Sequence, residues 1–395
     1  MPEVPVLPEA PVIRGDDPRS FPHSVLAERH PALIRKVEDA FPYGPGQRRA
    51  LGALLDSATG GTIEPLAEGA ADRERWDAWG RDHFGASWFA APFLWAESYF
   101  YRRLLEAVGY FTPGPWQGVD PFRPFKLAEL RTPEAAGELA ALDRTARLPE
   151  EEQWRALLHG SLWGNRADLG FRLTSGGAAD DGSPLVADDS EALRSLLTGD
   201  GAGGGRTLAL VADNAGRELV PDLLLVDHLL RHRHVERAVL HVKPHPYYVS
   251  DATTADVVDA LRHLADAGAE AGRAGRRLWD AMADGTLTVG AHAFFCAPLP
   301  YADMPDDLRR EFAGATLTVM KGDLNYRRLV GDRLWPPTTP FEGTTAYFPG
   351  PVAALRTLKS DVITGLTAPT EAALAAAGEQ RWRTSGSHAL IQVRP

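Results

Sequence analysis

The chain has little of what several protein classes require. It holds a single cysteine, Cys296, in 395 residues, so neither an intrachain disulfide nor a zinc cluster built on cysteines can form. Lys and Arg total 42 against 53 Asp and Glu, which gives a net charge of −11. Nucleic-acid binding needs a clustered basic face, and no basic run here is longer than a pair or so. We therefore expect no nucleic-acid partner.

Long apolar runs are also missing. The most apolar stretch, FGASWFAAPFLWAESYFY (84–101), is interrupted by Pro92 and Glu97 and is too short and too aromatic for a membrane span. The N-terminal segment, MPEVPVLPEAPVIRGDDPRS, has neither the basic nor the apolar region of a signal peptide. These absences predict a cytoplasmic protein with no membrane partner.

The pattern of residues divides the chain into three parts. Residues 1–25 are Pro-rich and predict an extended arm, whereas 26–195 are dominated by helical segments rich in Ala, Leu, Glu and Arg and end in a Gly-rich linker. From 206 to 395 apolar runs typical of strands (207–213, 236–243, 285–292 and 315–323) alternate with helical segments (216–232, 254–283 and 303–313). This alternation predicts an α/β/α domain with a Rossmann-like parallel sheet, preceded by an all-helical domain.

Polar residues follow nearly every predicted strand. Asp213 and Asn214 come after the first apolar run, Asp251 ends the segment after the second, and KGDLNYRRLVGD (321–332) follows the fourth. Arg356 and Lys359 lie beside a further strand candidate. The carboxyl ends of parallel strands meet at one edge of a sheet, where open α/β sheets bind their ligands. Any one of these turns has a plain explanation as a cap, but their coincidence predicts a site.

The residue types in this set indicate metal and anion chemistry. Asp213, Asn214 and Asp251 offer two carboxylates and an amide oxygen, which suit Mg²⁺ or Mn²⁺ with positions left for water. Positive charge for an anionic substrate is available from four residues: Lys321, Arg327, Arg356 and Lys359. A metal, basic side chains and water together are the means of phosphoryl transfer to water.

Several of these segments resemble one known family. DNAGRELVPDL (213–223), HVKPHPYYVSD (241–251), KGDLNYRRLVGD and RTLK (356–359), with AESYFYRRLLE (96–106) and LWGNRADL (162–169) upstream, resemble the damage-control phosphatases, formerly domain of unknown function 89, in their acidic-residue-methyltransferase-like subfamily. The resemblance covers about residues 90–366, and the combination of motifs is far more specific than any one of them. It implies a helical domain beside an α/β/α domain, and a metal-dependent phosphatase of small phosphorylated metabolites such as sugar phosphates.

The resemblance also implies roles for individual residues. Asp213, Asn214 and Asp251 would bind the metal, for which Mn²⁺ is the first candidate and Mg²⁺, Co²⁺ and Ni²⁺ are alternatives. Substrate contacts would come from Glu218, from the Asp323–Arg327 segment with Asp323, Asn325 and Arg327, and from Lys359. The residue pattern adds Lys321 and Arg356 as substrate-binding candidates. Glu97 and Asn165, in the two upstream motifs, would line the cleft, although a structural ion pair for Glu97 and a helix cap for Asn165 and Asp168 remain open. His292 is more simply explained as a structural histidine.

These assignments predict a mechanism. The metal would bind a phosphoryl oxygen and acidify a water molecule. Lys359, helped by Arg327, would offset phosphoryl charge, while Glu218 would orient or deprotonate the water. A covalent route with Asp213 as the nucleophile stays open, but it is less favoured because the chain lacks an Asp-x-Asp motif.

Two other functions compete with this one. The first is an S-adenosylmethionine-dependent carboxyl methyltransferase, but GDGAGGG (199–205) precedes the first strand of the domain, whereas a cofactor loop should follow it. The same position disfavours a dinucleotide dehydrogenase. The second is a non-catalytic phosphometabolite-binding protein, which would not need the three metal ligands that are present.

Overall fold

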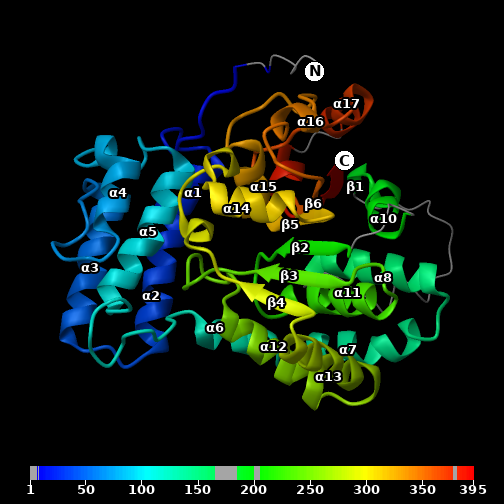
Figure 1. Cartoon of the computed structure of the whole chain (residues 1–395). Coiled ribbons are helices and arrows are strands. Elements are labelled where there is room, and N and C mark those ends of the chain that lie inside the picture. Colours follow the sequence, from blue (N-terminus) through cyan, green and yellow to red (C-terminus); the bar gives the residue numbers. More distant parts are fainter. Residues whose placement is uncertain (1–6, 8, 165–184, 200–204, 377–379) are drawn as a thin grey trace.

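The computed structural model describes residue 7 and residues 9–164, 185–199, 205–376 and 380–395. A seven-stranded sheet runs through it in the order β1-β7-β6-β5-β2-β3-β4 (Figure 1). The strands are β1 (Leu185–Asp188), β2 (Thr207–Val211), β3 (Arg237–His241), β4 (Leu287–Gly290), β5 (Leu317–Lys321), β6 (Val352–Thr357) and β7 (Ala389–Arg394). Neighbouring strands are parallel except for β6 and β7, so the carboxyl ends of β2 to β6 share one edge.

Some helices cover the two faces of the sheet, and others form a separate group at one side of the molecule. The first part of the chain holds α1 (Phe21–Ser24), α2 (His30–Ala40), α3 (Pro45–Gly60), α4 (Arg73–Gly80), α5 (Phe93–Val108), α6 (Arg123–Glu129), α7 (Pro133–Thr145) and α8 (Glu150–Trp163). The rest holds α10 (Ser190–Thr198), α11 (Leu219–Arg231), α12 (Thr254–Asp266), α13 (Ala269–Asp284), α14 (Asp306–Ala313), α15 (Gly322–Val330), α16 (Phe341–Thr344) and α17 (Ala368–Ala376). A π-helical turn, Val25–Arg29, joins α1 to α2.

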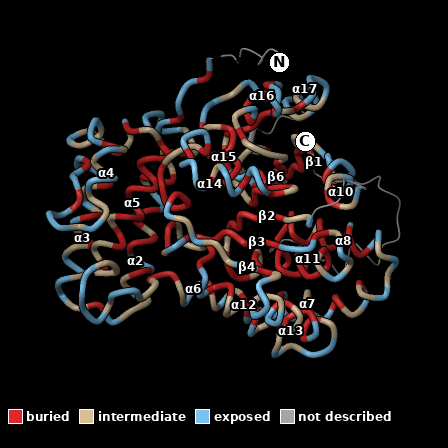
Figure 2. Tube along the Cα trace, viewed as in Figure 1, coloured by how far each residue is buried: buried red, intermediate tan, exposed pale blue. Residues whose placement is uncertain are grey.

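The strands are buried on both faces because successive side chains enter different cores. On β2, Leu208 and Leu210 pack with α8, α11, α12 and α13, while Ala209 and Val211 face α14 and α15 on the other side. Figure 2 shows this continuous burial along the central strands. The helices from α2 to α5 share a third core, which runs from Leu33 to Phe122 and is rich in aromatic side chains.

The predicted fold class, a Rossmann-like α/β/α sheet with a helical part before it, is confirmed. Two strands, β1 and β7, were not predicted, and the segment predicted as one helix (254–283) breaks at Ala267 and Gly268. The exact domain boundaries stay predictions. Helix α8 and strand β1 lie within the range assigned to the helical domain, yet α8 packs against the sheet and β1 is one of its strands.

Candidate functional site

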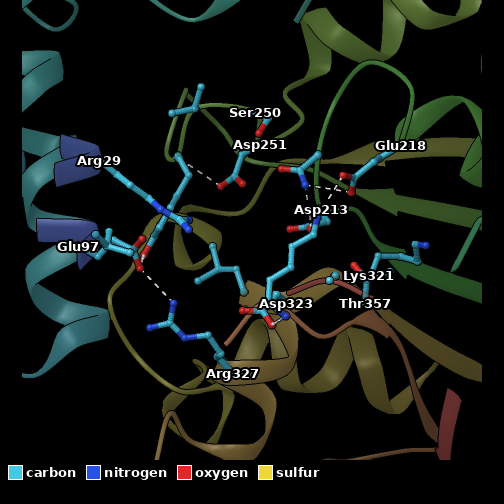
Figure 3. A pocket seen from close by; sticks show the side chains of 18 of the residues that line it. Arg29, Glu97, Asp213, Glu218, Ser250, Asp251, Lys321, Asp323, Arg327 and Thr357 are labelled. Atoms are coloured by element: carbon cyan, nitrogen blue, oxygen red, sulfur yellow. Dashed lines mark hydrogen bonds and ion pairs between the residues drawn. The ribbon is translucent and has the colours of Figure 1, made fainter. Parts of the chain in front are cut away.

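A cavity of about 900 Å³ lies at the edge of the sheet where β2, β3, β5 and β6 end. Helices α2 and α5 and the loop before α12 form the opposite wall (Figure 3). Nine of the predicted site residues line it: Glu97, Asp213, Asn214, Glu218, Asp251, Lys321, Asp323, Arg327 and Lys359.

The predicted metal ligands come together at the ends of β2 and β3. Asn214 and Asp251 form an antiparallel bridge, and the amide N–H of Ala252 donates to the carbonyl of Asp213 at 2.9 Å. The side chains of Asp213 and Asp251 are both buried, and Figure 3 shows the two carboxylates facing the same space. Backbone pairing between two loops therefore sets the spacing of these side chains.

A glycine allows the carboxylate of Asp213 to reach this position. Gly322, the first residue of α15, has φ of +82°, and a Cβ built on it would lie 1.8 Å from Oδ2 of Asp213. Any side chain at 322 would therefore displace either the carboxylate or the start of α15. The Gly of the KGD motif is thus explained by close approach to the acid.

The carboxylates of Asp213 and Asp251 are not paired with a basic side chain among the described residues. Burial, together with Glu218 and Asp251, raises the pKa of Asp213 well above its ordinary value, and burial also raises the pKa of Asp251. Among the described residues, neither side chain has an ion-pair partner within 4 Å. Two buried carboxylates and an amide beside them fit a hard divalent cation, because that donor set supplies oxygen ligands and its charge is otherwise uncompensated.

Glu218 and Lys359 extend the polar corner. Glu218 precedes the first turn of α11 and accepts a hydrogen bond from Nδ2 of Asn214 at 2.9 Å, and Nζ of Lys359 lies 3.5 Å from its other oxygen. Burial opposes the charge on Lys359, but Glu218 and Asp213 raise its pKa overall. The amine is therefore protonated at neutral pH and remains partly exposed to the cavity, with 47 % of the side chain accessible.

A buried lysine fixes the loop that carries Asp251. Nζ of Lys126, on α6, donates to the backbone carbonyl of Asp251 at 2.8 Å and to carboxylates of Asp120 and Asp256, each at 2.9 Å. Asp256 also accepts from Thr253 in the capping box that begins α12. This network connects the helical part of the chain to the loop after β3.

Arg327 and Lys321, two further cations that line the cavity, are held by protein carboxylates. Arg327 donates to Glu97 at 3.0 Å and to Asp332 at 2.6 Å, and Nζ of Lys321 lies 3.0 Å from Asp222. Burial raises the pKa of Glu97, and the nearby Arg327 opposes that rise. The charges of these two cations are largely offset before any substrate binds.

The remaining predicted residues lie elsewhere. Asn325 and Arg356 are fully buried behind the cavity wall: Asn325 donates to the carbonyl of Ala212, and Arg356 pairs with Asp323 at 2.7 Å. They are not among the residues that line the cavity, and their substrate contacts stay a prediction. His292 lies outside the cavity beside Asp307, at 3.3 Å. Asn165 and Asp168 lie outside the described residues.

Several lining residues were not predicted. Arg29 and Lys36 are exposed cations at the wall formed by the first helices, and His30, Tyr101 and Tyr248 add aromatic surface. Figure 3 shows Arg29 reaching toward the acidic corner. Nothing in the local sequence around 29–36 marks a site, because these residues meet the sheet edge only through packing of α2 on α5. Asp222 could have been predicted as a lining residue, because it follows Glu218 by one helical turn.

Comparison with known proteins places the chain in a family. The model of the damage-control phosphatase ARMT1-like domain matches residues 25–374, so the chain belongs to that family. It is 29 % identical to damage-control phosphatase ARMT1 of Mus musculus, with 96 % of this chain and 97 % of the relative covered. It is 30 % identical to the protein of that name from Xenopus tropicalis, with 95 % and 96 % covered.

A solved structure is also similar. The crystal structure of a DUF89 family protein from Pyrococcus horikoshii has a TM-score of 0.46 and 15 % identity, covering 85 % of this chain and 92 % of that one. In the part of the chain that the structure describes, no helix is long and apolar enough to cross a membrane.

Proposed function

We propose that this protein is a metal-dependent phosphatase that hydrolyses small phosphorylated metabolites, with sugar phosphates as the first candidates. The observation that carries the proposal is the acidic corner itself. Asp213, Asn214 and Asp251 meet inside one cavity, with buried carboxylates that have no ion-pair partner within 4 Å among the described residues and with Lys359 beside them. Membership of the damage-control phosphatase family supports the same reaction class.

The donor set indicates which residues would hold the cation. Carboxylate oxygens of Asp213 and Asp251 and the amide oxygen of Asn214 suit Mn²⁺, and Mg²⁺, Co²⁺ and Ni²⁺ are compatible with the same atoms. When bound, such a cation supplies a Lewis acid for a phosphoryl oxygen and increases the acidity of water.

The residues of the chain supply the rest of the chemistry. The ammonium group of Lys359 lies at the cavity surface and would offset negative charge on the phosphoryl oxygens, an effect that grows in a partly buried site. Glu218 is held by Asn214 and Lys359 at the start of α11, where its carboxylate is placed to orient a water molecule or accept its proton. Arg327 would act mainly by holding Glu97 against the wall.

The cavity fits a small polar substrate. Its volume of about 900 Å³ is within the range of about 300–1,000 Å³ that small-molecule sites span. Tyr101 and Tyr248 offer flat surfaces with hydroxyl groups, and Arg29 and Lys36 place positive charge at the rim. A phosphorylated sugar would meet the acidic corner with its phosphate and the aromatic wall with its ring.

Phosphate release from a panel of sugar phosphates and para-nitrophenyl phosphate tests the proposal. We expect release with Mn²⁺, loss of release with a chelator, and a decrease of at least about 100-fold in Asp251→Asn, since even the outer partners of metal ligands cost about 10–100-fold. Asp307→Asn, an exposed carboxylate outside the cavity, is the matched control and should retain full activity. Absence of phosphate release with every metal, together with methyl transfer from S-adenosylmethionine, would contradict the proposal.

A further inference from the structure

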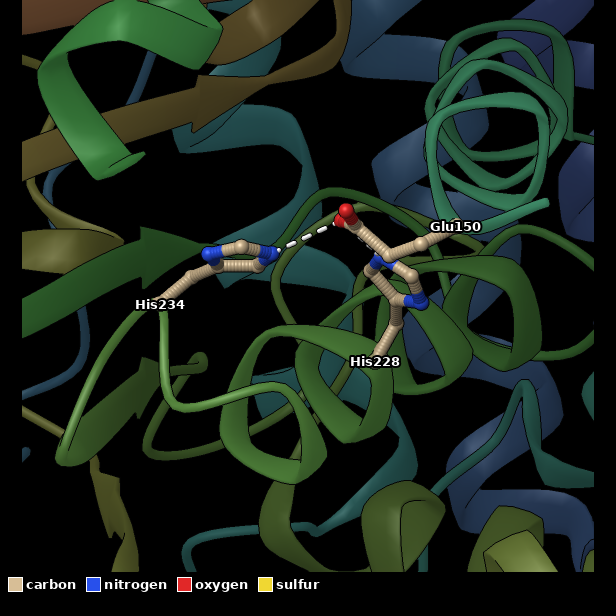
Figure 4. A group of neighbouring side chains, drawn as sticks. All are labelled: Glu150, His228 and His234. Atoms are coloured by element: carbon tan, nitrogen blue, oxygen red, sulfur yellow. Dashed lines mark hydrogen bonds and ion pairs between the residues drawn. The ribbon is translucent and has the colours of Figure 1, made fainter. Parts of the chain in front are cut away.

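A second group of ligand-type side chains lies at the far end of helix α11. His228 belongs to its last turns, His234 follows in the turn before β3, and Glu150 is the first residue of α8. Oε1 of Glu150 lies 2.9 Å from Nε2 of His234 and 3.7 Å from Nε2 of His228. Figure 4 shows the carboxylate between the two imidazole rings.

The three ligand atoms are close enough to share one ion. All lie within 4.8 Å of one another, and they come from three separate segments of the chain. Glu218 and His228 are ten residues apart on α11, which corresponds to about 15 Å along the helix axis. The group is therefore distinct from the cavity at the opposite end of that helix.

An ion pair explains only part of this arrangement. The contact between Glu150 and His234 satisfies one ring nitrogen. His228 is 1 % exposed, and neither of its ring nitrogens has a hydrogen-bond partner among the residues that the structure describes. Nε2 of the neighbouring His232 is also buried without a partner, and its ring centre lies 4.4 Å from that of His228. Buried polar atoms are normally paired, so these nitrogens indicate a missing partner that accepts lone pairs.

The other charged side chains beside the cluster already have partners. Arg231 lies on the same turn and donates to Gln153, and Asp227 is already paired with Arg277 at 2.6 Å. They therefore leave Glu150 as the acid that faces the two imidazoles.

We propose that Glu150, His228 and His234 form a zinc-type site that joins the start of α8 to the end of α11. Two imidazoles and one carboxylate are a known ligand set for Zn²⁺, and imidazole also suits Ni²⁺ and Cu²⁺. This set differs in kind from the oxygen donors of the cavity. The site lies away from the proposed chemistry, so its expected contribution is to hold the two helices together.

Zinc titration of the chelator-treated full chain tests this proposal, with a chromophoric chelator as competitor. We expect tight binding that persists in Asp251→Asn and becomes weaker by about tenfold or more in both His234→Gln and Glu150→Gln. His292→Gln is the matched control, because His292 also contacts a carboxylate, Asp307, but lies outside the cluster. Circular dichroism establishes that each variant is folded.

The spectrum of bound Co²⁺ gives a second readout. A four-coordinate site with imidazole ligands should produce strong visible absorption that His234→Gln removes and Asp251→Asn retains. Zinc affinity that is equal in the wild type, His234→Gln and Glu150→Gln would overturn the proposal. So would a zinc stoichiometry that Asp251→Asn abolishes completely.

Discussion

Two groups of buried carboxylates at the floor of the cavity differ in whether a basic side chain balances their charge. At the ends of β2 and β3, Asp213 and Asp251 are buried and have no ion-pair partner among the described residues, and burial raises the pKa of both. At the ends of β5 and β6, burial would also raise the pKa of Asp323, but Arg356 and Arg327 hold it below its ordinary value. Asp323 additionally accepts hydrogen bonds from the Lys359 N–H and the Ser360 hydroxyl, each at 3.1 Å.

The difference indicates which corner needs a ligand. The charge of a buried carboxylate that pairs with an arginine is already balanced, so a bound cation would stabilise it little. A pair of buried carboxylates without such a partner is costly in the absence of a cation. Neighbouring acids at one sheet edge are therefore not equivalent, and the proposed metal site is at the corner with Asp213 and Asp251 rather than at the corner with Asp323.

The largest expected effect on stability is at the paired corner. Asp323→Asn keeps the shape of the side chain but leaves the guanidinium of Arg356, which is 0 % exposed, without its counter-charge. Breaking a buried ion pair from one side costs about 3–5 kcal/mol in the free energy of unfolding, so we expect a loss near about 3 kcal/mol by urea denaturation. Asp17→Asn, at an exposed pair with Arg19, is the control and should leave the midpoint unchanged. Equal midpoints for the two variants would contradict the contrast between the corners.

A smaller effect should appear in the pH dependence of stability. His30, in the aromatic wall of the cavity, stacks on Phe100 with ring centres 3.6 Å apart, and in the described part of the chain neither ring nitrogen has a hydrogen-bond partner. Burial lowers its pKa from 6.5 to about 3. The folded chain therefore binds fewer protons than the unfolded chain between these values, and the stability, complete above pH 6.5, decreases as the pH falls.

Replacing His30 measures how much this residue contributes to the loss of stability at acidic pH. In His30→Phe the slope of unfolding free energy against pH, between about pH 6 and 4.5, should decrease by up to about 1.4 kcal/mol per pH unit, the value for one proton. Denaturation by urea at several pH values gives this slope. The same slope in the wild type and in His30→Phe would show that His30 is not the buried neutral group described.

Much of the fold could be predicted from the sequence, since β2, β3, β4 and β5 are apolar runs followed by polar residues. Strand β7 was not predicted because Gln392 interrupts its apolar pattern. The side chain of Gln392 is buried through hydrogen bonds with Tyr326 and Thr364. No local pattern indicates such distant partners.

The candidate site shows the same limit. The convergence of Asp213, Asn214 and Asp251 follows from the topology of a parallel sheet, and the structure brings these residues together as expected. The sequence could not distinguish an arginine that faces the cavity from one that supports it. Arg356 does not face the cavity, because its guanidinium donates to the carbonyl of Val362 and to the carboxylate of Asp323. Arg29 was missed because only tertiary packing places it at the rim.

Thermal unfolding with and without Mn²⁺, in the wild type and in Asp251→Asn, tests the central claim most directly. Without metal, Asp251→Asn should be at least as stable as the wild type, because the substitution removes a buried charge beside Asp213 while keeping an acceptor for the N–H of Tyr248. With Mn²⁺ at 100 times its Kd, the wild type should gain about 2.7 kcal/mol and the variant almost nothing. An equal gain in both proteins, or none in the wild type, would contradict a metal site at the ends of β2 and β3.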